Sequence, residues 1–131
     1  MDDMYREQIL EHARHPHNFG TIEGASVSHE EHNPLCGDRV RIDLLIEDGV
    51  ITNVRFSGRG CAISQASASM LTDELRGMSV EQARAYRKDD LLALIGIPLS
   101  KNPTRLKCAL LSLKTLKAGL YGVGQVSDDE L

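Results

Sequence analysis

Three cysteines and one aspartate are the residues of this chain whose types and spacing best suit chemistry. Cys36 and Asp38 are separated only by Gly37, whereas Cys61 and Cys108 lie far along the chain. Alternate residues of an extended backbone point to the same side, so we expect the Cys36 thiol and the Asp38 carboxylate on one side. Thiolate and carboxylate donors around one ion suit zinc or iron.

The four donors would complete a tetrahedral metal site if the fold gathers Cys36, Asp38, Cys61 and Cys108. Their spacing is not that of paired C-x-x-C motifs, so the prediction depends on where the elements place them. Cys61 follows a glycine-rich stretch and precedes a helical pattern, and a helix N-terminus favours a thiolate. Lys107 adds positive charge beside Cys108. Asp38 is the weakest donor to a soft metal and is therefore the ligand most easily exchanged.

Periodic patterns predict the elements that position these donors. Alternating apolar residues over 40–46 and 51–56, with a turn at 47–49, indicate a hairpin, and the polar stretch 25–33 is predicted as an edge strand. Helical spacing and caps predict helices over residues 5–15, 62–76, 79–86 and 88–95, and from 102 onward. The fold class is therefore α+β, with a small, about three-stranded antiparallel sheet and helices packed over one face.

Length and composition indicate one soluble domain over residues 1–131. The net charge of -4 and the absence of a basic stripe argue against nucleic-acid binding. No apolar run approaches the length that spans a bilayer, and no signal peptide is visible, so we expect a cytoplasmic protein without membrane contact. In a reducing compartment, cysteines serve as ligands or reactive thiols rather than as disulfides.

Simpler interpretations exist for the same residues. Each cysteine taken alone is also consistent with a small buried hydrophobe, and a zinc ion could hold the fold without doing chemistry. His12, His15 and His17 straddle a predicted helix end and Pro16, so they do not share one helical face. We therefore predict that these histidines are surface residues.

Three motifs resemble those of the IscU/SufU/NifU N-terminal family. They are Asn-Pro-Leu-Cys-Gly-Asp at 33–38, Gly-Arg-Gly-Cys-Ala-Ile-Ser at 58–64 and Arg-Leu-Lys-Cys at 105–108, and the opening stretch 5–20 is similar too. The resemblance implies a small antiparallel sheet with helices and a role in iron–sulfur cluster assembly. It leaves two functions open: zinc-dependent acceptance and relay of persulfide sulfur from a cysteine desulfurase, or a scaffold that assembles and transfers a [2Fe-2S] cluster.

The same resemblance implies roles for individual residues. Cys36, Asp38, Cys61 and Cys108 correspond to the zinc or iron ligands, and the three cysteines would hold the cluster in the scaffold alternative. Lys107 stands where the scaffold branch carries histidine, which places the chain nearer the SufU branch.

The implied partners are a cysteine desulfurase and an apo iron–sulfur acceptor or downstream scaffold. Cys36 is the expected sulfur acceptor. We thus expect an accessory or scaffold protein rather than a stand-alone enzyme, and a structural zinc module for protein docking remains a third alternative.

Overall fold

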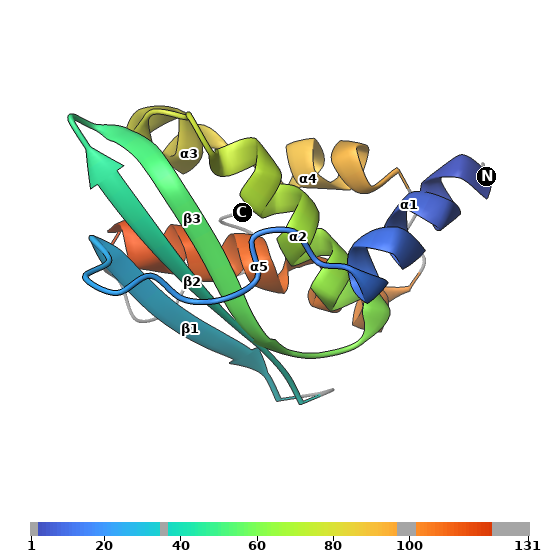
Figure 1. Ribbon diagram of the computed structural model, residues 1–131. Helices are drawn as coiled ribbons and strands as arrows, with labels where there is room; N and C mark the ends of the chain where they lie inside the picture. The colour runs from blue at the N-terminus through green and yellow to red at the C-terminus, as the bar shows by residue number, and fades with distance from the viewer. Residues whose placement is uncertain (1–2, 35–36, 97–101, 122–131) are drawn as a thin grey trace.

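The computed structural model describes residues 3–34, 37–96 and 102–121. Strands β1 (Val27–Asn33), β2 (Asp38–Glu47) and β3 (Val50–Arg59) form one antiparallel sheet in the order β1-β2-β3. Helices α2 (Ala62–Leu75) and α5 (Pro103–Tyr121) lie against the sheet and against each other, as Figure 1 shows. The predicted α+β fold, with a three-stranded antiparallel sheet and helices packed on it, is confirmed.

The hairpin of β2 and β3 forms the centre of the sheet. Val40, Ile42 and Leu44 alternate along β2 and are at most 2% exposed, because their shared face is covered by helices. The turn places Asp48 and Gly49 at φ angles of 52° and 76°, and positive φ at both positions suits the tight turns that join such strands. β1 is polar and lies at an edge of the sheet, as its sequence predicts.

Helix α2 can approach its neighbours closely along the part of its buried face that is made of small residues. Ala66, Ser67, Ala68 and Ser69 are all buried, and α5 packs against this helix. The remaining helices are α1 (Asp3–Arg14), α3 (Val80–Ala85) and α4 (Lys88–Ile95). None of the helices in the described ranges is both long enough and apolar enough to cross a membrane.

The N-terminal helix α1 packs against α2 and carries a buried histidine. His12 is only 8% exposed, and its Nδ1 lies 2.6 Å from the Ser69 hydroxyl. The segment after Pro16 turns back over α2, which brings the rings of His12 and His17 to a centroid distance of 4.4 Å. The prediction that these histidines are surface residues is wrong for His12. Two residues that share no helical face can still meet when the chain doubles back.

Burial lowers the pKa of His12 from 6.5, and the neighbouring His17 lowers it further, against the opposing charges of Asp73 and Glu11. The folded state therefore favours neutral His12. Its contribution to stability is fully present above pH 6.5 and is lost as the pH falls below that value. We expect the free energy of unfolding, measured by urea titration between about pH 7.5 and 5.5, to decrease on acidification.

His12→Gln introduces an amide that can bond the Ser69 hydroxyl but cannot titrate, so it should flatten this pH dependence. His15→Gln, at an exposed neighbouring histidine, should leave the dependence as steep as in the parent protein. Equal slopes in the parent protein and in His12→Gln would contradict the assignment.

Candidate metal centre

The hairpin and α2 together place Asp38 beside Cys61. Arg39 at the start of β2 pairs with Arg59 at the end of β3, so the chain leaving β3 passes Asp38 on its way into α2. Cys61 is the N-cap residue of α2 and has no side-chain capping bond of its own. Its backbone N–H donates to Asp38 Oδ1 at 3.2 Å, and its thiol donates to Oδ2 at 3.5 Å. The carboxylate therefore accepts two hydrogen bonds from one residue.

Helix α5 supplies the third donor of this group. Cys108 lies near the start of α5 and is 4% exposed. One candidate ligand atom from each of Asp38, Cys61 and Cys108 lies within 4.8 Å of the other two. Asp38 and Cys108 are buried while Cys61 is exposed, so solvent and partners reach the group from the Cys61 side.

The structure thus brings together three of the four donors that the sequence singles out. The fourth, Cys36, lies outside the described residues. The role of all four residues as metal ligands remains a prediction. What the geometry adds is that donors from β2, α2 and α5, far apart in sequence, reach one place.

Two glycines let the backbone come close enough for this arrangement, and sequence reasoning did not identify their roles. A Cβ at Gly60 would lie 2.8 Å from Asp38 Cγ and 3.0 Å from Ser64 Oγ. Gly58 has a φ of +133°, and a Cβ there would lie 2.0 Å from the backbone oxygen of Arg39. A side chain at Gly58 would push β2 away from β3, and one at Gly60 would push the Asp38 carboxylate away from the start of α2.

The donor set fits a zinc-type or iron ion. Two thiols and one carboxylate are suitable ligands for such an ion and leave room for a fourth donor. Ser64, one helical turn into α2, adds a buried hydroxyl that has no hydrogen-bond partner among the described residues. Since this hydroxyl lies beside Asp38 around Gly60, it can donate to a ligand held there.

Two lysines of α5 bring positive charge to this part of the molecule, and one of them, Lys107, precedes Cys108. Lys107 and Lys114 line a pocket of about 220 Å³ together with His32 and Asn33. Asn33 pairs with Asp38 across β1 and β2, so the pocket borders the candidate centre. The lysines can offset the negative charge of thiolates and a carboxylate around a divalent ion.

The fold and the site define a class of small α+β domains in which thiols and a carboxylate meet at the junction of a sheet and two helices. The chain belongs to the family described as the NifU-like N-terminal domain, whose model matches residues 4–125. This confirms the family that the three cysteine motifs indicate.

Two relatives illustrate the range of the family. The chain is 35% identical to the zinc-dependent sulfurtransferase SufU of Bacillus subtilis, over 92% of this chain and 91% of that protein. It is also 35% identical to the iron–sulfur cluster assembly scaffold protein IscU of Thermotoga maritima, over 93% of this chain and 96% of that protein.

Solved structures share the fold. The crystal structure of a putative iron–sulfur cluster assembly scaffold protein for the SUF system from Fervidobacterium islandicum has a TM-score of 0.73 at 28% identity, covering 92% of this chain and 99% of that one. A hypothetical protein solved at 2.3 Å resolution has a TM-score of 0.81 at 29% identity, with the same coverage of both chains.

Gly60→Ala tests whether the close approach of the chain to Asp38 sets metal affinity. The added methyl group would displace the carboxylate and weaken its bond from the Cys61 N–H. We expect about a 10- to 100-fold loss of Co²⁺ affinity, the range that misplaced supporting contacts cost metal sites. The affinity is measured by adding Co²⁺ to the protein and following the absorption band of thiolate-to-cobalt charge transfer.

Gly119→Ala is the matched control. It adds a methyl group 3.1 Å from His29 and Val27, but it lies about 16 Å along α5 from Cys108 at the helical rise of 1.5 Å per residue. It should leave Co²⁺ affinity unchanged. Equal affinities in both variants would show that Gly60 does not position the carboxylate.

Proposed function

We propose that this protein acts in iron–sulfur cluster assembly as a zinc-dependent acceptor and relay of persulfide sulfur from a cysteine desulfurase. The supporting observation is the convergence of Asp38, Cys61 and Cys108 within 4.8 Å of one another. Membership of the NifU-like N-terminal domain family and similarity to a relative named as a zinc-dependent sulfurtransferase support the same function.

Zinc would be held by Asp38, Cys61 and Cys108, with Cys36 as the fourth ligand. Bound zinc keeps ligating sulfurs in the thiolate form, which is the nucleophilic form of cysteine. Asp38 is the weakest of the four donors for a soft ion. The hydrogen bond from the Cys61 backbone N–H holds the carboxylate in place when it does not ligate.

Cys36 is the sulfur acceptor that we favour. Cys108 is buried, which hinders approach by a partner's persulfide. Cys61 is fixed as the N-cap residue of α2, where its backbone N–H donates to Asp38. The Cys36 thiolate attacks the outer sulfur of the desulfurase persulfide. A new S–S bond forms at Cys36, the S–S bond of the desulfurase breaks, and the desulfurase cysteine leaves as a thiolate. Thiol–persulfide exchange of this kind needs no outside oxidant or reductant.

The relay role defines partners and location. A cysteine desulfurase supplies the sulfur, and an apo iron–sulfur acceptor or a downstream scaffold receives it. We place this exchange in the cytoplasm, where thiols stay reduced. The protein is then an accessory of the desulfurase rather than a stand-alone enzyme, because the sulfur it carries is released from cysteine elsewhere.

Cys36→Ala should reduce stimulation of the desulfurase nearly to the rate of the desulfurase alone, because the accepting thiolate is gone. Turnover is followed as alanine release from cysteine. In the parent protein, mass spectrometry should detect one added sulfur atom on Cys36 after incubation with desulfurase and cysteine.

Thr104→Ala, an exposed position at the start of α5, is the control and should stimulate as the parent does. Stimulation that survives intact in Cys36→Ala would exclude Cys36 as the acceptor. If thiol alkylation of the metal-bound protein leaves stimulation intact and metal removal unfolds it, the zinc is only structural.

A scaffold for a [2Fe-2S] cluster is the second candidate function. It is favoured by the equal similarity of the chain to a relative named as an IscU scaffold, and it would use Cys36, Cys61 and Cys108 to hold the cluster under construction. In this alternative the metal that the protein binds is iron rather than zinc.

Anaerobic incubation with iron and sulfide separates the two functions. For a sulfur relay we expect no stable visible absorption of a cluster on the protein, while persulfide acceptance continues. A cluster that persists and then passes to an apo-acceptor, with matching loss of absorption, would establish the scaffold role instead.

A further inference from the structure

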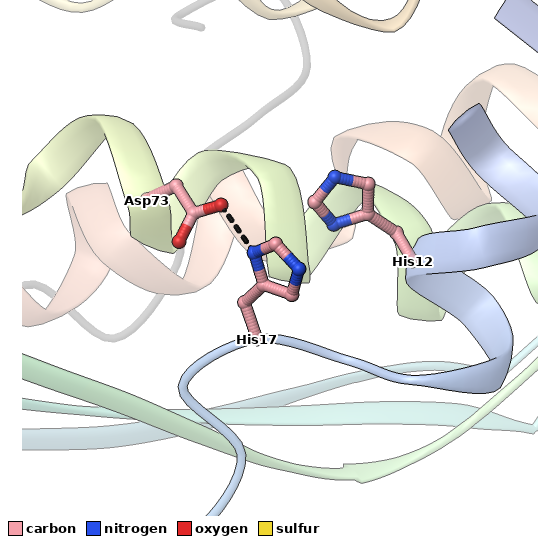
Figure 2. Close-up of side chains that lie close together, drawn as sticks. All are labelled: His12, His17 and Asp73. Atoms are coloured by element: carbon pink, nitrogen blue, oxygen red, sulfur yellow. Dashed lines mark hydrogen bonds and ion pairs between the residues drawn. The ribbon is translucent and has the colours of Figure 1, made fainter.

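A second group of potential metal ligands lies toward the C-terminal end of α2, apart from the cysteines. His12 comes from α1, His17 from the segment that follows it, and Asp73 from the last turn of α2; Figure 2 shows the three side chains together. One candidate ligand atom from each residue lies within 4.8 Å of the other two. His17 Nδ1 is 2.6 Å from Asp73 Oδ2.

This group is separate from the candidate metal centre described above. Cys61 caps the N-terminus of α2, and Asp73 is twelve residues further along the sequence. At a rise of 1.5 Å per residue, these two positions are about 18 Å apart. One ion cannot contact both groups, so a metal bound at the histidines would be an additional ion.

The donor atoms suit a borderline divalent ion. Imidazole nitrogen is a favoured ligand of zinc, nickel and copper, and carboxylate completes many such sites. Zinc lies about 2.0–2.2 Å from such donors, so tetrahedral neighbours are about 3.3–3.6 Å apart. Donors within 4.8 Å need to move by only about an ångström. His17 and Asp73 can do so, because their side chains are 50% and 45% exposed.

Further hydrogen bonds hold these donors in place. The Ser69 hydroxyl accepts from the backbone N–H of His17 at 2.7 Å and contacts His12 Nδ1 at 2.6 Å. Asn18 Nδ2 donates to Asp73 Oδ1 at 2.9 Å, and Arg76 donates to Asn18 at 2.7 Å. Supporting contacts of this kind orient metal-binding histidines and carboxylates and raise their affinity.

We propose that His12, His17 and Asp73 form a second binding site for a divalent transition metal of the zinc class. Three protein donors leave a coordination position for water or an exchangeable ligand, as in open rather than closed zinc sites. The site joins α1 and its following segment to α2, so metal binding there also fixes the N-terminal part of the chain against the domain. An alternative is a metal-free network in which His17 and Asp73 are only an ion pair.

The test is to count the zinc bound by the full chain. The untagged protein is dialysed against buffered Zn²⁺. The number of zinc ions bound per chain is measured, together with the affinity for each successive ion. His17→Ala removes a half-exposed donor and leaves the buried His12 in place, so folding is not at risk. We expect His17→Ala to bind one zinc ion fewer than the parent protein.

Two variants make the result specific. His15→Ala, at an exposed histidine outside the group, should bind as much zinc as the parent does. Asp73→Asn keeps the shape of the side chain but removes its charge. It should weaken zinc binding at the histidine site about 10- to 100-fold or more. In Co²⁺ titrations, His17→Ala should retain the thiolate-to-cobalt absorption, because the cysteine centre is untouched.

The outcomes separate this site from the proposed function. If the cysteine centre fails to bind zinc but the histidine site is correct, the parent binds one ion, and His17→Ala binds none. If the parent, His17→Ala and His15→Ala bind the same number of ions with the same affinities, the histidines and Asp73 are a metal-free network and the second site does not exist.

Discussion

The contact between the Asp38 carboxylate and the start of α2 is the constraint on which the candidate centre depends. The first backbone N–H groups of a helix have no partner within the helix, and the helix dipole attracts negative charge there. The Asp38 carboxylate supplies both the hydrogen-bond acceptor and the negative charge, because it accepts a hydrogen bond from the Cys61 N–H at 3.2 Å. Gly60 permits the approach because it has no side chain. One carboxylate therefore fixes the end of a hairpin, the start of a helix and one of the cysteines.

Helix α2 organises the rest of the molecule around this contact. Its N-terminus carries Cys61, and the small residues of its buried face admit α5, which brings Cys108. Further along the same helix, Ser69 and Asp73 hold the histidines of the N-terminal segment. Two groups of potential metal ligands thus depend on one rigid element, which keeps them about 18 Å apart. Rigid elements hold such sites more accurately than loops do.

Sulfur relay and cluster scaffolding make the same structural demands on this protein. Both need thiolates that are held together yet reachable from outside, and the exposed Cys61 beside the buried Asp38 and Cys108 meets that demand. The chain is 35% identical both to a relative named as a sulfurtransferase and to one named as a scaffold. Overall similarity therefore does not separate the two functions.

The sequence by itself determined the type and order of the elements, and most of their ends to within two residues; the second strand of the hairpin runs on to Arg59, past the predicted end at 56. Alternation identified the hairpin, and Ser79 forms a capping box with Gln82 at the start of the helix predicted over 79–86. Asn102 accepts from the Arg105 N–H at the start of α5, and Cys61 lies at the N-terminus of α2. These features follow from residues a few positions apart, because strand period, helix period and capping are local interactions. The three cysteine motifs also identified the family.

Only the tertiary structure decided which distant residues meet. That Cys108 reaches Cys61 and Asp38 depends on the packing of α5 against α2 and the sheet. That His12 is buried beside His17 depends on the chain turning back over α2 after α1 ends. The need for glycine at position 60 appears only when Asp38 is in place. Such contacts arise from the burial of whole faces against one another, and no short-range pattern in the sequence records which faces will pair.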